Sequence, residues 1–182
     1  MTAIPTLTTA RLTLRPFADA DAVQALLSSP EIAATTLLIP HPYSDGAASA
    51  WISTHGDAAE RGAALHWAIA RADDQTLLGA VTLRITPDHR RGEIGYWLGV
   101  PFWNRGYATE AARRVIGHAS AALGLIRVEG TCLPANPASA RVMKNAGMKQ
   151  EGALHGYVRK NGRFEDVDVF AIVSTDRVDQ VF

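Results

Sequence analysis

The sequence is poor in several features that would point to particular classes of protein. It has one cysteine, Cys132, which excludes an internal disulfide and suits a reducing cytoplasm. Its 18 basic and 18 acidic side chains cancel, so no overall charge draws it to nucleic acid or to an anionic membrane. No apolar run reaches the ~20 residues of a membrane span. The first residues lack a basic stretch followed by an apolar core, so no signal peptide is expected.

Several ligand motifs are also missing. No Gly-Lys-Ser/Thr follows the glycine at position 106, which excludes a P-loop, and the other glycines of a dinucleotide fingerprint are absent. The six histidines have no metal-ligand spacing. The sequence therefore predicts no metal site, and any anion site must be built locally.

The 182 residues are enough for one sizeable domain with its own core, and we expect a single domain over residues 1–182. Alternating or continuous apolar patterns predict strands at 11–17, 64–72, 76–85, 91–100, 125–133 and a closing hairpin at 157–173. One-sided apolar stripes and capping signals predict helices at 19–29, 47–61 (interrupted by Gly56), 107–124 and 134–148. This pattern indicates a mixed α+β domain with an antiparallel meander at its centre.

The turn Asn104–Thr109 leads from a strand into a helix. Helix N-termini carry unpaired N–H groups and positive dipole character, so they bind phosphate where the backbone is accessible. Gly106 has no Cβ and lets a ligand approach, and Arg105 can add charge-assisted contacts. The alternative is that Gly106 only makes the turn, and these residues alone leave both open.

Two further features carry a structural and a chemical interpretation. Asn136 is a good N-cap before Pro137, yet its amide, like the hydroxyl of Ser139, can also serve a ligand. Glu93 interrupts an apolar strand, sharing a face with Gly95 and Trp97. It is either exposed at an edge or partly buried and able to accept a proton.

Taken together, four segments resemble the GNAT acetyltransferase superfamily, specifically its RimJ/RimL-like branch. The resemblance covers nearly the whole chain and is carried by the order and spacing of "TARLTLRPF", "GEIGYWLGVPFWNRGYATEAARRVIGHA", "NPASARVMKNAGM" and "EGALHGYVRKNGRFEDVDVFAI". It implies an α+β fold with a central, mostly antiparallel mixed sheet flanked by helices. Two strands of that sheet splay apart in a V, and acetyl-CoA enters the gap.

The resemblance also implies a set of cofactor-binding residues. The CoA pyrophosphate would be held by the backbone N–H groups of Arg105, Gly106, Tyr107, Ala108 and Thr109. Of these, Gly106 and Ala108 match fixed positions of the family's phosphate loop, whereas Trp103 replaces its leading Gln/Arg and Asn104 stands where glycine is common. The pantetheine would pair with the strand end at Leu98, Gly99 and Val100.

Three roles complete the implied site. Asn136 matches the asparagine that contacts the pantetheine arm, and Ser139 matches the hydroxyl that protonates the departing thiolate in some members of the family. A backbone N–H near 98–100 would stabilise the oxyanion. Because a primary amine arrives protonated, a base is needed, and Glu93 is the first candidate, acting through a water. Some relatives instead carry a glutamate where this chain has Val158, so their arrangement is not simply copied; the remaining candidates are His66, Tyr157 and Asp166.

The sequence thus predicts an acetyl-CoA-dependent N-acetyltransferase that transfers the acetyl group directly to a primary amine, either a protein N-terminus or a small molecule. It needs no metal, nucleic acid or membrane, and would act in the cytoplasm as a monomer or homodimer. A non-catalytic acyl-CoA-binding sensor with the same fold is the alternative, and a nucleotide-binding protein of another fold is a second.

Overall fold

A computed structural model describes residues 4–174, so the ends of the expected 1–182 domain lie outside the described residues. The strands are β1 Leu7–Thr8, β2 Leu12–Arg15, β3 Ala64–Arg71, β4 Leu77–Thr86, β5 Arg91–Leu98, β6 Arg127–Cys132, β7 Lys149–Lys160 and β8 Arg163–Val173. The α-helices are α1 Ala20–Leu27, α2 Pro30–Thr35, α3 Ala47–Ser53, α4 His55–Glu60, α5 Tyr107–Ala121 and α6 Pro137–Asn145. Short 3-10 turns lie at Pro87–His89 and Val100–Phe102.

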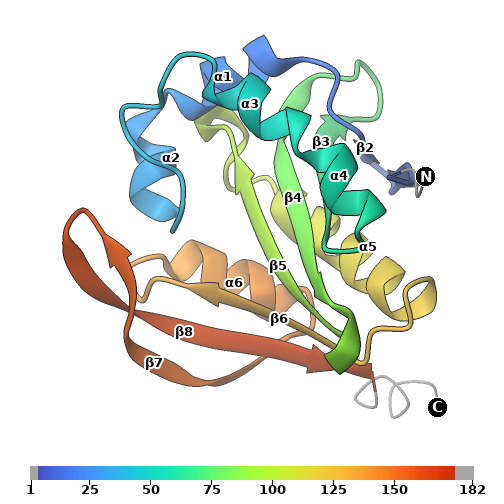
Figure 1. Cartoon of the computed structure of the whole chain (residues 1–182), viewed down its shortest axis with the longest axis vertical. Helices are drawn as coiled ribbons and strands as arrows, with labels where there is room; N and C mark the ends of the chain where they lie inside the picture. Colours follow the sequence, from blue (N-terminus) through green and yellow to red (C-terminus); the bar gives the residue numbers. More distant parts are fainter. Residues whose placement is uncertain (1–3, 175–182) are drawn as a thin grey trace.

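All eight described strands form one sheet in the order β1-β2-β3-β4-β5-β6-β8-β7. The pair β5–β6 is parallel and its register covers only residues 91–93 and 127–129, whereas the other pairs are antiparallel. Beyond this contact the two strands diverge, which Figure 1 shows as a wedge between the green and orange parts of the sheet. The expected α+β fold with a splayed, mostly antiparallel sheet is confirmed.

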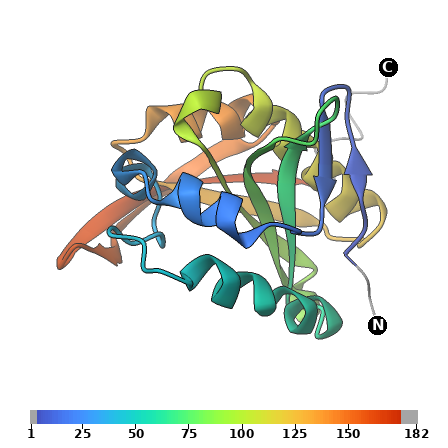
Figure 2. The same ribbon diagram turned by 90° about the horizontal axis from the view of Figure 1, so that it is seen from above.

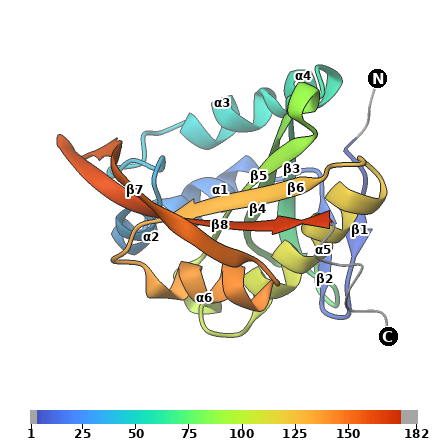
Figure 3. The same cartoon turned by 90° about the horizontal axis from the view of Figure 1, so that it is seen from below.

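Each face of the sheet is covered by its own helices (Figure 3). The apolar stripe of α5 packs on one face with α6 nearby, against fully buried side chains that include Trp67, Val81 and Leu83. On the other face Trp97 packs in a separate cluster with residues of α1, α2 and α3. The side chains of β5 alternate between these two clusters, so one strand serves both faces, as its sequence predicted.

Local sequence signals placed several boundaries correctly. The Asp19 side chain accepts a hydrogen bond from Ala22 N–H at the start of α1. Asn136 caps α6, with Pro137 in its first turn. Asn161 and Gly162 both have positive φ, 49° and 80°, as the two-residue turn of the β7–β8 hairpin requires.

Other boundaries differ from the expectation. The break between α3 and α4 lies at Thr54, and Gly56 sits inside α4. Strand β7 begins at Lys149, well before the expected Tyr157. Helix α2 was not predicted, although Ser29-Pro30 is a usable start signal, because six residues are too few for a clear periodicity. None of the helices within residues 4–174 is long and apolar enough to cross a membrane.

Candidate active site

A cavity of about 830 Å³ lies where β5 and β6 diverge. It reaches both faces of the sheet, because its lining includes residues of the α5 and α6 face and residues beneath α3. We call the first group the α5 side, formed by Gly106, Tyr107, Ala108, Thr109 and Ser139. We call the second group the α3 side, formed by Trp51, His66, Thr82, Arg84 and Glu93.

The N-terminus of α5 opens into the cavity. Gly106 is its N-cap, with φ of 81°, and no side chain caps the helix there. A Cβ at Gly106 would meet only Arg11 Nη2, at 3.4 Å, so it is the backbone conformation that favours glycine. The first-turn N–H groups are therefore available to an anion. Arg105 is not among the lining residues, and its carbonyl accepts from Arg11 Nη1 at 3.1 Å.

The end of β5 offers backbone groups to the gap. Gly99 N–H donates to Leu78 O at 2.8 Å, which commits it to β4. Since successive residues of a strand direct their N–H groups to opposite sides, those of Tyr96 and Leu98 point toward the diverging β6. The Leu98 carbonyl already accepts from Trp103 Nε1 at 2.8 Å. Of the three expected pantetheine-pairing residues, Leu98 lines the cavity, whereas Gly99 and Val100 do not.

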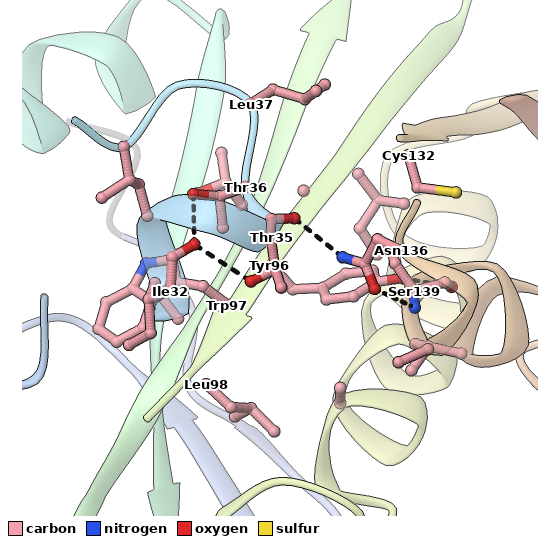
Figure 4. Close-up of a pocket in the computed structure, with 18 of the residues that line it drawn as sticks. Ile32, Thr35, Thr36, Leu37, Tyr96, Trp97, Leu98, Cys132, Asn136 and Ser139 are labelled. Carbon is pink, nitrogen blue, oxygen red and sulfur yellow. Dashed lines mark hydrogen bonds between the residues drawn. The ribbon is translucent and has the colours of Figure 1, made fainter. Parts of the chain in front are cut away.

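Asn136 joins α6 to α2 across the cavity. Its Oδ1 accepts from Ser139 N–H at 3.0 Å, and its Nδ2 donates to Thr35 O at 2.9 Å. Figure 4 shows this second bond crossing from the end of α2 to the start of α6. Both ends of the amide are thus bonded within the protein. The expected pantetheine contact stays a prediction; the second Nδ2 hydrogen and the second Oδ1 lone pair, which these two bonds do not use, could make it.

Ser139 is paired with a tyrosine that the sequence did not single out. The Tyr96 and Ser139 hydroxyl oxygens lie 2.9 Å apart, and the Tyr96 hydroxyl also lies 3.1 Å from Ser139 O, which it can donate to. Burial raises the Tyr96 pKa well above its usual value, so the phenol stays protonated. The two-residue alternation of the strand could have pointed to it, because Tyr96 lies on the same, α6-facing side of β5 as Ile94 and Leu98.

The α3 side carries a polar row across three strands. In the sheet register His66 lies opposite Thr82, and Arg84 lies opposite Glu93. His66 Nδ1 is 2.9 Å from Thr82 Oγ1. Arg84 Nη1 is 3.9 Å from Glu93 Oε1, a loose ion pair whose glutamate side chain is 46% exposed. Glu93 is therefore neither an isolated edge residue nor fully buried, and its carboxylate faces the cavity.

His66 of this row stacks on a second histidine, His55, and both are neutral. His55 and His66 stack with ring centroids 4.1 Å apart, and Trp51 meets His55 edge-on at 4.5 Å. Burial lowers the pKa of both histidines to about 4, and the pKa of His55 is lowered further by the neighbouring His66. At neutral pH they therefore add aromatic surface to the α3 side and no charge.

Helix α2 covers the cavity and is bonded to a lysine at the end of β7. Lys160 Nζ donates to three carbonyl oxygens at its C-terminal end, those of Ala33 at 2.7 Å, Ala34 at 2.9 Å and Thr36 at 2.6 Å. A cation there also complements the negative end of the helix dipole. Figure 2 shows the end of the β7–β8 hairpin extending to α2. Sequence patterns gave no sign of this contact, because its partners lie more than 120 residues apart.

Cys132 ends β6 and lines the cavity, where the sequence had suggested a position within the strand. Burial raises the pKa of its thiol to about 11, which keeps it protonated and weakly nucleophilic at neutral pH. This suits direct transfer, with no covalent intermediate on the protein.

The other candidate bases are divided between the cavity and the rest of the surface. Among them His66 lines the cavity, while Tyr157 and Asp166 do not. Tyr157 is 61% exposed on β7, and the Asp166 carboxylate bonds His155 Nδ1 at 2.8 Å. Within residues 4–174 no group of three or more His, Cys, Asp or Glu side chains is placed to hold a metal ion.

Comparisons with known proteins confirm the resemblance to the GNAT acetyltransferases. Residues 11–149 match the family described as Acetyltransferase (GNAT) domain. The uncharacterized N-acetyltransferase YoaA of Bacillus subtilis (strain 168) is 33% identical over 172 residues, covering 93% of this chain and 97% of that protein. The ribosomal-protein-serine acetyltransferase of Escherichia coli (strain K12) is 31% identical over 113 residues, covering 62% of each chain.

A solved structure has the same fold at lower identity. Mycobacterium smegmatis RimJ, in complex with CoA-disulfide, superposes with a TM-score of 0.84 at 24% identity, covering 95% of this chain and 89% of that one. The splayed sheet, the open α5 N-terminus and the match over residues 11–149 lead to one conclusion. This chain belongs to the GNAT acetyltransferase family, whose members use acetyl-CoA.

Proposed function

We propose that this protein transfers the acetyl group of acetyl-CoA directly to a primary amine, with the cofactor on the α5 side and the acceptor on the α3 side. The observation that carries the proposal is the single cavity that joins the two sides through the splay of β5 and β6. A reaction between two separately bound molecules requires their reacting atoms to meet, and only such a passage lets them do so across a sheet.

The α5 side fits the cofactor. The uncapped first turn of α5, over 107–109, suits the pyrophosphate of CoA, and the outward N–H groups of Tyr96 and Leu98 suit the amides of its pantetheine arm. The backbone of the segments beside these groups, at Gly99, Val100 and Arg105, would support the cofactor site. When bound, acetyl-CoA supplies the acetyl group as a thioester whose sulfur can leave as a thiolate.

Three groups of the chain would carry the proton and charge transfers. Glu93 takes the proton from the ammonium, directly or through a water. Of the outward N–H groups of Tyr96 and Leu98, the one nearer the thioester donates to its oxygen as negative charge develops there, and the other pairs with the pantetheine. Ser139 gives its proton to the leaving sulfur and regains one from the attacking nitrogen, which still carries an extra proton after the attack. Tyr96 positions Ser139 when its phenol donates to Ser139 Oγ rather than to Ser139 O, because the serine proton is then free to point into the cavity.

Three broader properties belong to the same proposal. One domain spans 1–182, since the described strands share a single sheet. The protein acts in the cytoplasm, which suits its single thiol. It works as a monomer or a homodimer, because the cavity is lined within one chain.

The test is acetylation of an amine panel. Protein, acetyl-CoA and each amine are mixed, thiol release is followed, and products are identified by mass spectrometry as acetylated amines. We expect thiol release that depends on both the protein and the amine. If the protein binds acetyl-CoA but acetylates no peptide or small amine, it is a non-catalytic sensor. A melting temperature raised by ATP or NAD and not by CoA would instead favour a nucleotide-binding protein.

A further inference from the structure

The α3 side of the cavity has one anion and one cation side by side. Glu93 is the one carboxylate among the described residues that line the cavity. Arg84 lies opposite it in the β4–β5 register, with 3.9 Å between Nη1 and Oε1. This distance is long for a charge-assisted hydrogen bond, so each group keeps bonding capacity for a ligand.

The walls around this pair are apolar or neutral. Tyr43, Trp51, Leu27 and Ile32 line the same cavity and pack in the cluster around Ala80 and Trp97, and His66 is uncharged at neutral pH. An acceptor whose amine lies at Glu93 would therefore place its remaining atoms against apolar and aromatic surface, which favours a ligand body of the same character.

The charge pattern separates the classes of amine. A simple monoamine pairs with Glu93 but brings a second cation beside Arg84. A polyamine adds more cations, and the neighbouring carboxylate, Glu129 opposite Glu93 on β6, is already paired with Arg91 and Arg127. A peptide N-terminus offers Arg84 only an uncharged carbonyl. A zwitterion with an ammonium and a carboxylate on one carbon compensates both groups at once, and its insertion leaves the net charge of the site unchanged.

The position of α2 over the cavity favours a small acceptor. Three bonds from Lys160 and one from Asn136 hold the end of α2 at the cavity, so an acceptor that extends from Glu93 toward α2 meets a tethered segment. A single amino acid does not extend that far.

We propose that the acceptor is a free α-amino acid with an apolar or aromatic side chain, its ammonium on Glu93 and its carboxylate on Arg84. This inference rests on the proposed function, since it names the substrate of the same cavity. Arg84 is then a specificity-determining residue.

The experiment compares four amines that differ in charge: L-phenylalanine, L-phenylalaninamide, phenethylamine and spermidine. Calorimetric titration into the protein saturated with CoA, which cannot react, measures binding, and thiol release with acetyl-CoA measures kcat/KM. We expect L-phenylalanine to exceed the amide and phenethylamine by about 10- to 100-fold in both readouts, the usual range for a charged hydrogen-bonding partner. Spermidine should be the weakest ligand.

Arg84→Met should remove that preference by weakening L-phenylalanine and by binding phenethylamine no worse than the wild type does, because the second cation is gone. Arg84→Lys should restore part of the preference. Arg91→Met is the matched control, because Arg91 is equally exposed, forms an ion pair with Glu129 and lies outside the cavity lining. Equal or stronger binding of phenethylamine or the amide to the wild-type protein would overturn the inference, and this holds whether or not the variants fold. Binding of L-phenylalanine without thiol release would uphold the inference and reject the proposed transfer.

Discussion

The two sides of the cavity are built in different ways. The α5 side is largely local in sequence, since a glycine, a helix start and a capped helix place Gly106 and Ser139 over short stretches of chain. The α3 side is assembled by sheet register, which brings His66, Thr82, Arg84 and Glu93 together from three strands. The residues that bind a shared cofactor through their backbone can therefore be near neighbours in the sequence. The residues that bind a particular acceptor come from positions far apart in the sequence.

Removing the charge of Glu93 should break the α3 side most severely. Glu93→Gln loses the proton acceptor, so we expect kcat to fall by ~100-fold or more while the Kd for acetyl-CoA stays unchanged. Steady-state kinetics and calorimetric titration measure the two quantities. The control is Glu129→Gln, which alters the residue opposite Glu93 on β6 and lies outside the cavity lining. Unchanged turnover in Glu93→Gln across pH would remove this residue as the base.

A Cβ at Gly106 should damage the α5 side. Gly106→Ala forces a side chain into the left-handed region and so disturbs the loop whose N–H groups would hold the pyrophosphate. Acetyl-CoA affinity should fall by about 10-fold, with a stability loss of roughly 1 kcal/mol. Gly162→Ala is the matched control, because Gly162 has φ of 80° in the hairpin turn, where an added Cβ meets nothing within 4 Å. It should lose similar stability and no affinity. Equal affinity in both variants would reject the phosphate loop.

The stacked histidines should make the α3 side sensitive to acid. Their pKa values are about 4 in the folded protein, against 6.5 for an ordinary histidine, so the unfolded chain binds more protons between these limits. The free energy of unfolding should then fall as the pH drops from about 6.5 to 4, by roughly 3 kcal/mol per histidine. His55→Phe keeps the stack and should reduce this decline in thermal unfolding by about half, because His66 still contributes, whereas His155→Gln should not reduce it. Parallel declines for His55→Phe and the wild type would contradict the assignment.

Weakening the contacts that hold α2 over the cavity should have the smallest effect. Lys160→Met removes three bonds to α2, so the KM for the acceptor should rise several-fold while the Kd for acetyl-CoA is retained. Arg159→Met, at the adjacent exposed position on β7, should change neither. An acceptor KM that Lys160→Met leaves unaltered would mean that α2 does not shape the acceptor site.

The same difference between the two sides explains how far the sequence could lead. Periodicity and capping residues predicted the central strands, α5 and α6, because these signals lie within one element. The resemblance supplied the role of the α5 side, and Glu93 stood out as an acid in an apolar strand. Arg84, Tyr96 and Lys160 gave no such signal. Their partners, Glu93, Ser139 and the end of α2, are fixed by strand pairing and helix docking, which single-element patterns do not encode.

The most direct test of the account is a double-variant cycle across the two sides. The Kd for acetyl-CoA and the kcat at saturating substrates are measured for the wild type, Gly106→Ala, Glu93→Gln and the combined variant. We predict that Gly106→Ala changes chiefly the Kd, that Glu93→Gln changes chiefly kcat, and that the two effects add in the combined variant. A Glu93→Gln protein that loses acetyl-CoA affinity while keeping kcat would contradict the division of one cavity into a cofactor side and an acceptor side.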